Sequence, residues 1–194
     1  YEVATRVGSA AGTELLLRGF HPQGTHGTIA SAVTAAKLMT LNKEQTLHAM
    51  GIAGSLGAGL MAAQEGAMVK RLHSGRAAEA GVLAAELAAK KFTGISNIIE
   101  ADYGGYLSTF SGKNNFARAT DQLGEVWECA NTGIKPYSSV TSIHAALDSL
   151  KAIMKGNKIL SNDIKEIKAK ISHPTYVHCA WAYENQNVTS AQMN

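Results

Sequence analysis

The N-terminal part of the chain alternates segments of helical periodicity with short turns that contain glycine or proline. In the first segment, Val3, Val7 and Leu15 recur at the spacing of one helix face, before a stop at Gly19. The same pattern predicts an all-helical region. Its helices are expected over residues 2–18, 28–39, 42–60, 76–91 and 115–122, with a further short helix within residues 94–110.

Glycines interrupt the predicted helix over residues 42–60, which begins with an Asn42 and Gln45 capping pair. Gly51, Gly54, Gly57 and Gly59 follow, and each glycine costs roughly 1 kcal/mol relative to alanine in a helix interior. Such a cost is usually tolerated where another backbone or a ligand must approach closely, so we expect close packing along this segment.

The pattern changes near Gly124, where glycine and alanine become less frequent. We predict strands over residues 126–135, 164–171 and 177–183, a helix over residues 138–154 and a helical turn capped by Ser161. The fold class is therefore mostly α, with an all-helical domain over residues 1–122 and the start of an α+β domain over residues 123–194. Because the helical pattern is already under way at Tyr1, we expect a piece of a longer protein.

The overall composition excludes several classes of function. With 18 Lys and Arg against 15 Asp and Glu, the net charge of +3 is too small to indicate nucleic acid or a membrane surface as partner. No apolar run is long enough for a membrane span, and no export leader is evident. Cys129 and Cys179 stand far apart, which argues against an iron–sulfur cluster or structural zinc and favours a reducing cytoplasm.

A basic stretch, Lys70–Arg76, is the strongest candidate for chemistry. It places Lys70, Arg71, His73 and Arg76 in a predicted loop between two segments rich in alanine, glycine and leucine. Burying unpaired charge costs several kcal/mol, so these groups need a reason to enter an apolar interior. An anionic ligand is one reason, and a solvated loop with clustered basic residues is the alternative.

Two further groups lie beside proline: His21 with His26, and Lys135 with Tyr137. Loops and element ends on a rigid scaffold often carry functional groups. A histidine beside a glycine turn is also a common loop hydrogen-bonder, and Lys135 can simply be solvated. The loop with the two histidines has no acidic residue, so we expect no metal site there. His48 and His144 fall on predicted helices and are interpreted as core or interface residues.

Three motifs, in order, resemble the MmgE/PrpD family, which includes 2-methylcitrate dehydratases, cis-aconitate decarboxylases and an iminodisuccinate epimerase. The motifs are Gly19-Phe-His-Pro-Gln-Gly-Thr-His-Gly27, Met68-Val-Lys-Arg-Leu-His-Ser-Gly-Arg-Ala-Ala78, and Lys135-Pro-Tyr137 with His144-Ala-Ala-Leu-Asp148. The resemblance implies a cytoplasmic homodimer in which an all-helical domain and an α+β lid domain enclose the active site. It implies no iron–sulfur cluster or other cofactor.

Carried over by motif, His21, Lys70 and Lys135 correspond to the family's active-site histidine and two lysines. Ammonium groups would hold the carboxylates and stabilise the enolate-like charge that forms when a Cα proton leaves. A neutral imidazole suits acid–base work near pH 7. Four more residues of the same motifs would complete substrate binding: His26, His73, Arg76 and Tyr137.

The chain also departs from the family pattern. The family's remaining Asp, Thr and His belong upstream of these motifs, and a Tyr belongs beyond Asn194. Val140 stands where decarboxylases carry a histidine, five residues after Lys135. The resemblance therefore implies a lyase that eliminates water from a 2-methylcitrate-like polycarboxylate. The alternatives are a cis-aconitate-type decarboxylase, a dicarboxylate epimerase or isomerase, and an inactive remnant that binds polycarboxylates or dimerises.

Overall fold

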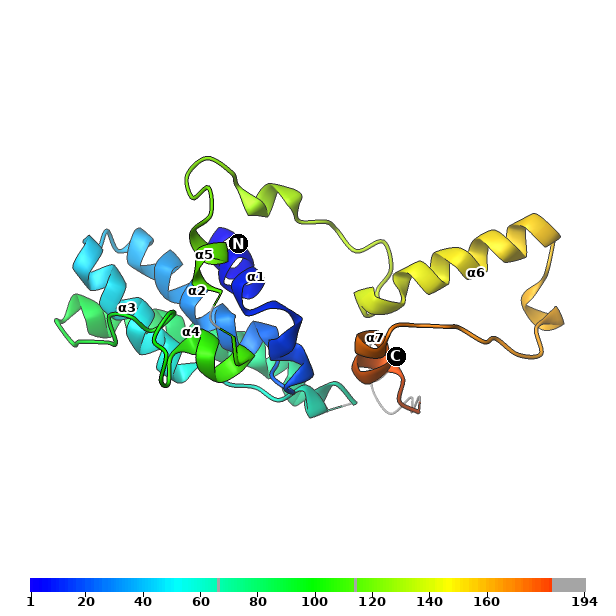
Figure 1. Ribbon diagram of the computed structural model, residues 1–194, viewed down its shortest axis with the longest axis horizontal. Helices are drawn as coiled ribbons and strands as arrows, with labels where there is room; N and C mark the ends of the chain where they lie inside the picture. Colours follow the sequence, from blue (N-terminus) through cyan, green and yellow to red (C-terminus); the bar gives the residue numbers. More distant parts are fainter. Residues whose placement is uncertain (66, 114, 183–194) are drawn as a thin grey trace. The chain divides into compact units, whose positions relative to one another are not determined.

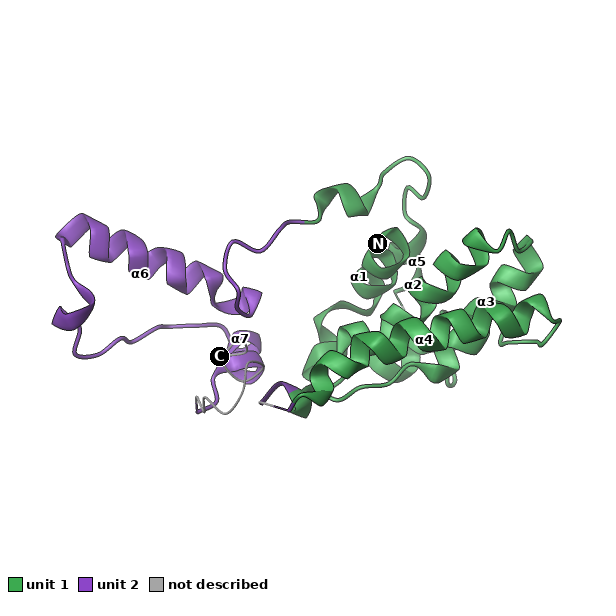
Figure 2. Cartoon of the chain, turned by 180° about the vertical axis from the view of Figure 1, so that it is seen from behind, with its two compact units in different colours: residues 1–63, 68–132 green, residues 64–67, 133–194 purple. Residues whose placement is uncertain are grey.

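The computed structural model describes residues 1–65, 67–113 and 115–182. The chain divides into two compact units, residues 1–63 with 68–132 and residues 64–67 with 133–194 (Figure 2). Helices dominate the described part of both units, which confirms the prediction of a mostly α protein. The predicted domain boundary after residue 122 stays a prediction.

The first unit is built on four long helices. Helices α2, α3 and α4 pack against one another in pairs, and α1 packs on α2 (Figure 1). The bounds of these helices are α1 Glu2–Leu17, α2 Pro22–Leu38, α3 Lys43–Leu56 and α4 Val69–Ala89. Shorter elements in this part of the chain are a 3-10 turn at Met61–Glu65, a π-helix at Leu107–Ser111, α5 at Phe116–Thr120 and a 3-10 turn at Glu128–Asn131.

Small residues allow α2, α3 and α4 to approach closely. Their shared core is largely alanine, and includes Ala32, Ala53 and Ala84, none of which is exposed. A Cβ added at Gly51 would lie 2.2 Å from the Ile95 carbonyl oxygen. This contact confirms that the glycine in α3 serves close approach of another backbone.

Three helix boundaries of the first unit differ from the sequence prediction by at least four residues, and the helix predicted over residues 138–154 lies at His144–Asn157. Helix α2 begins at Pro22 instead of residue 28, and α4 begins at Val69 instead of residue 76, while α3 ends at Leu56 instead of residue 60. Proline favours the first helical position because its fixed φ suits the helix and its missing N–H would be unsatisfied there anyway. The two segments predicted as loops, which contain His26 and the basic stretch, are therefore helical.

Two residues of α1 that form an ion pair, Arg6 and Glu2, also hydrogen-bond to the segment that follows α5. Arg6 contacts Glu2 at 2.6 Å and donates to the carbonyl oxygens of Asp121 at 2.7 Å and Val126 at 2.6 Å. The Glu2 carboxylate also accepts the backbone N–H of Cys129 at 2.9 Å. The hydrogen bonds that the Glu2 carboxylate accepts, above all the one from the Cys129 backbone, lower the pKa of Glu2 from 4.5 to about 2.

We expect this network to make the first unit sensitive to acid. Because the pKa of Glu2 is lower in the folded state, its contribution to stability is complete above about pH 4.5 and is lost as the pH falls towards 2. Denaturant titrations at pH 5 and pH 3 measure the change. Glu2→Gln should be less stable than the wild type at pH 5 and should lose less stability between the two values. An equal loss in both proteins would contradict the assignment.

The second unit contains α6, His144–Asn157, and α7, His173–Cys179, joined by a largely irregular segment (Figure 2). Single 3-10 turns lie at Thr141–Ile143 and Ser161–Asp163; the second confirms the predicted helical turn, but its N-cap residue is Leu160 instead of Ser161.

The three predicted strands are wrong over the described residues. Residues 126–135 hold a 3-10 turn, residues 164–171 form no ladder, and residues 177–179 belong to α7, while Tyr183 lies outside the described residues. A strand requires a hydrogen-bonded neighbour, and this region of the described chain offers only an isolated bridge between Leu123 and Val126. Pro174 occupies the first turn of α7, which the Ser172 hydroxyl caps, so it begins a helix instead of ending a strand.

Candidate active site

His21 is held at the start of α2 by paired backbone segments. It is the N-cap residue of the helix, and its N–H donates to the Gly59 carbonyl oxygen at 3.0 Å. The Met61 N–H donates back to the Gly19 carbonyl oxygen at 2.8 Å, and Phe20 and Leu60 form an antiparallel bridge. These bonds fix the backbone that carries the His21 imidazole, which is 5% exposed.

The structure brings His21 and His73 together. Their Nδ1 atoms lie 2.9 Å apart and their ring centroids 5.0 Å apart, so the two imidazoles share a hydrogen bond. Gly59 packs against the His73 ring and the Cβ of His21: a Cβ at Gly59 would lie 3.0 Å from His73 Nδ1 and 3.4 Å from His21 Cβ. A glycine beyond the end of α3 therefore makes room for the pair.

The basic stretch forms the first two turns of α4. Lys70 and His73 are three residues apart and so lie on neighbouring positions of one helix surface. Lys70 is half-buried, while Arg76 is exposed and forms an ion pair with Glu79 on the same helix. Positive side chains near a helix N-terminus are unfavourable by about 0.3–1 kcal/mol each, because the macrodipole is also positive there. This accumulation of positive charge favours an anion.

A cavity of about 380 Å³ opens beside His73. Its polar lining comes from His73 and from the Arg76–Glu79 pair. Its apolar lining comes from α2, α3, α4 and the turn that follows α3. The apolar and small lining residues are Gly24, Leu56, Ala58, Gly59, Val69, Leu72, Ala77, Ala80 and Leu83. Its volume suits a small organic anion.

His26 does not line this cavity. It contributes to a second cavity of about 320 Å³, between residues 4–15 of α1 and the start of α2. Its Nδ1 is buried and makes no hydrogen bond to the described chain. Burial lowers the pKa of His26 from 6.5 to about 4, so the imidazole is neutral near pH 7.

We expect His26 to destabilise the first unit in mild acid. Its pKa is lower in the folded state, so below about pH 6.5 the unfolded chain binds a proton that the folded chain does not. The free energy of unfolding should fall by roughly 2–3 kcal/mol between pH 6.5 and pH 4, because a difference of one pH unit between the two pKa values corresponds to about 1.4 kcal/mol. Denaturant titrations of the wild type and His26→Gln measure the effect, and a wild-type slope in the variant would contradict it.

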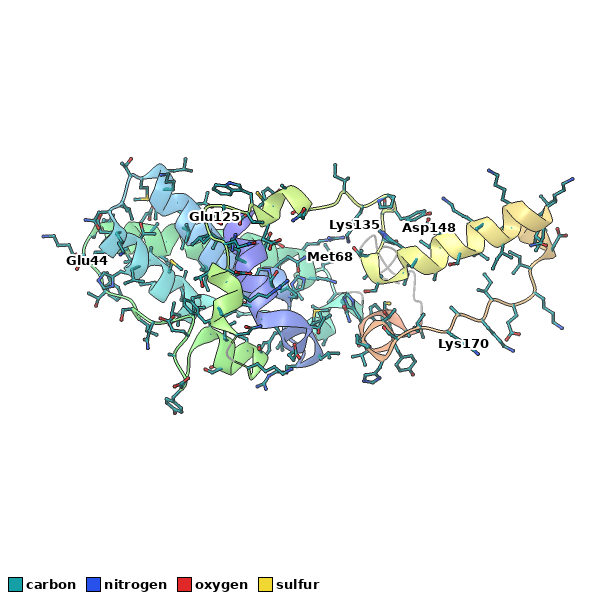
Figure 3. All side chains as sticks on the ribbon, turned by 45° about the horizontal axis from the view of Figure 1, so that its top comes forward. Glu44, Met68, Glu125, Lys135, Asp148 and Lys170 are labelled. Carbon is teal, nitrogen blue, oxygen red and sulfur yellow. The ribbon has the colours of Figure 1, made fainter. Side chains whose placement is uncertain are left out.

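Lys135 and Tyr137 belong to the second unit, where Figure 3 shows Lys135 and Asp148 at the same end of α6. Lys135 is exposed, and its Nζ donates to the Ser139 carbonyl oxygen at 3.2 Å. The Tyr137 hydroxyl donates to the Asp148 carboxylate, and the Lys151 ammonium lies 4.6 Å from the tyrosine ring centroid. Tyr137 is thus held from two sides by residues of α6.

The interpretation of His48 and His144 agrees with their positions. His48 is half-buried and its Nδ1 lies 3.3 Å from the Gly94 backbone, a contact that joins α3 to the loop after α4. His144 is buried at the start of α6, with its ring 5.1 Å from that of Tyr137.

Sequence reasoning quoted Asp148 in a motif without giving it a role, and it did not single out Lys151 or Glu79. Asp148 and Lys151, which hold Tyr137, give a recognisable signal, because they stand three residues apart on one surface of a predicted helix. Glu79 similarly follows Arg76 by three residues. The pairing of His21 with His73 has no local signal, since 52 positions separate them.

Clusters that could hold a metal ion and helices that could span a membrane are both absent from the residues that the structure describes. No group of three or more His, Cys, Asp or Glu side chains in that part of the chain is arranged to hold a metal ion. No helix described here is both long and apolar enough to cross a membrane.

The chain resembles known proteins over its whole length. It is 33% identical to the cis-aconitate decarboxylase-like protein oryM of Aspergillus oryzae, over 100% of the chain and 43% of that relative. It is 29% identical to a cis-aconitate decarboxylase of Aspergillus terreus, over 98% of the chain and 41% of the relative. A Homo sapiens cis-aconitate decarboxylase is 29% identical over 82% of the chain and 34% of the relative. The chain thus spans less than half the length of these relatives.

Residues 1–119 match the MmgE/PrpD N-terminal domain. This match covers α1 to α4, and with them the His21–His73 pair and the basic stretch. As the motifs around His21 and Lys70 predict, the protein belongs to the MmgE/PrpD family.

Proposed function

We propose that the full-length protein is a lyase that acts on a small polycarboxylate. The observation that carries the proposal is the buried His21–His73 pair beside the basic first turns of α4. A proton-transferring imidazole next to concentrated positive charge suits a substrate with several carboxylates and an acidic Cα–H bond. The names of the relatives support the same class of reaction.

In this proposal, His21 transfers the proton and Lys70 stabilises negative charge. For water elimination from a 2-methylcitrate-like acid, Nε2 of His21 removes the Cα proton and the electron pair forms the double bond. The β-hydroxyl leaves as water after accepting a proton. The Lys70 ammonium lowers the energy of the enolate-like transition state, because its charge faces the carboxylate on which negative charge grows.

Decarboxylation of a cis-aconitate-like acid is a second candidate, favoured by the names of the relatives. There a carbon–carbon bond breaks, carbon dioxide leaves, and the remaining carbanion takes a proton from a protonated imidazole. Val140 weakens this second candidate, because the resemblance places a decarboxylase histidine at this position, where the chain has a buried valine.

The remaining roles come from the resemblance. Lys135 would act as the second catalytic lysine and Tyr137 as a substrate ligand, while His26, His73 and Arg76 would assist binding. Arg76 is already paired with Glu79, so it would bind substrate with reduced charge. The same resemblance supports a cytoplasmic homodimer without a cofactor.

Proton NMR of the full-length protein in D2O tests the proposal with 2-methylcitrate, cis-aconitate and a 2-substituted succinate. Loss of water from the first would support the dehydratase, and loss of carbon dioxide from the second would support the decarboxylase. Exchange of a Cα proton for deuterium without net elimination would replace the lyase with an epimerase or isomerase. No change in any of the three would contradict the proposed function.

A further inference from the structure

We infer that His73 is the proton-sharing partner of His21: it sets which nitrogen of His21 reacts and takes up part of the charge of the protonated ring. This inference rests on the proposed function, and it assigns His73 a positioning role that acts through His21, in place of the substrate-binding role that the resemblance implies. It is carried by the hydrogen bond of 2.9 Å between the two Nδ1 atoms.

The geometry restricts the protons of the pair. A neutral imidazole carries one N–H, so a bond between two Nδ1 atoms needs one ring protonated at Nδ1 and the other at Nε2. When His21 donates, its Nε2 holds a lone pair and is the base; when His73 donates, Nε2 of His21 carries the proton and is the acid. Two doubly protonated rings would place two N–H groups against each other, which breaks the bond. The pair therefore holds at most one extra proton.

The proton transfer balances within the pair. Nε2 of His21 accepts the substrate proton, which makes the ring an imidazolium with both nitrogens protonated. Its Nδ1 proton can then move to Nδ1 of His73. His21 is left neutral with Nε2–H, ready to act as the acid, and His73 carries the charge. A return of the Nδ1 proton after the acid step restores the starting arrangement.

The burial of His21 favours transfer of the proton to His73. His21 is 5% exposed, and an imidazolium in such a place is disfavoured by desolvation. His73 is half-buried and lines the cavity of about 380 Å³, so moving the charge to His73 moves it towards the open side. The Gly59 backbone lies against the His73 ring and the His21 Cβ, and its carbonyl oxygen accepts the His21 N–H, so it holds the two side chains at bonding distance.

Two variants in the full-length protein separate the parts of this role. His73→Asn places an amide near the position of Nδ1, so it can accept from His21 but cannot take the proton. His73→Leu removes both functions. Since general acid–base catalysis contributes about 10²–10⁴-fold, we expect kcat to fall about 10-fold in the first variant and about 10²-fold or more in the second. KM should change less than about threefold in both.

A raised KM with unchanged kcat would overturn the inference, because it would show that His73 only binds substrate. Wild-type kcat in His73→Asn would overturn the charge-sharing part. If His73→Leu fails to fold by circular dichroism, the asparagine variant alone decides.

Nitrogen-15 NMR of the histidine-labelled protein tests the bond without turnover. We expect His21 to be protonated at Nδ1 and His73 at Nε2 in the resting protein, with His21 assigned by its change in His73→Asn. Both rings protonated at Nε2, with no proton between the Nδ1 atoms, would overturn the inference. A shared proton in a protein without lyase activity would contradict the proposed function and leave the pair standing.

Discussion

Replacing Lys70 by alanine is expected to lower kcat/KM of the full-length protein by about 10²–10³-fold. Lys70 lies in the first turn of α4, where the helix macrodipole and the neighbouring basic groups already favour an anion. Its ammonium is a compact charge, which suits a single carboxylate oxygen on which negative charge grows during proton abstraction. Steady-state kinetics on the substrate identified in D2O measure the loss.

Two variants control this prediction. Lys90→Ala removes an exposed ammonium at the other end of α4 and should leave kcat/KM unchanged. Lys70→Arg keeps the charge but spreads it over a wider guanidinium, so its activity should lie between that of Lys70→Ala and the wild type. Activity of Lys70→Ala within about threefold of the wild type would remove Lys70 from the site.

The sequence predicts the helical nature of the first unit because each long helix shows its own periodicity. Where the prediction fails, residues that favour a turn lie in a helix that tertiary packing stabilises. The motif around Gly24 contains residues typical of a turn, yet α2 continues through it, because Pro22 starts the helix and Gly24 packs against the Ala58 carbonyl oxygen. The basic stretch likewise contains Ser74 and Gly75, which α4 accommodates.

The sequence predicted which residues belong to the site but not which of them are in contact. The motifs single out His21 and His73, since these residue types beside lysine suit acid–base chemistry. Their hydrogen bond depends on the packing of α2 against α4 and on the Gly59 backbone between them. Such contacts come from tertiary structure, which periodicity in one segment does not encode.

The strands predicted after residue 124 failed for a related reason. Segments in which isoleucines are interspersed with charged residues, such as residues 164–171, are compatible with a strand that has one buried face, but a strand forms only with a neighbour to bond. Over the described residues this segment has no such neighbour. Helix α6 was predictable because helical hydrogen bonds are local to the segment.

Gly59→Ala is expected to disrupt the His21–His73 pair and to destabilise the first unit by at least about 2 kcal/mol. Gly59 has φ of 133°, a region that L-residues avoid at a cost of about 1–3 kcal/mol. The added Cβ would also lie 3.0 Å from His73 Nδ1 and 3.2 Å from its Cγ, so the ring would have to shift by a few tenths of an ångström, which disturbs its bond to His21. Because the His21 N–H donates to the Gly59 carbonyl oxygen, any shift of this backbone displaces both histidines.

Gly75→Ala is the matched control. Gly75 lies within α4 close to His73, and a Cβ there meets nothing within 4 Å. Alanine is favoured over glycine in a helix interior by about 1 kcal/mol, so this variant should be slightly more stable than the wild type and keep the shared proton. Denaturant titration and nitrogen-15 NMR of the histidines measure both effects. Equal stability of the two variants, or an intact bond in Gly59→Ala, would mean that the Gly59 backbone does not hold the pair.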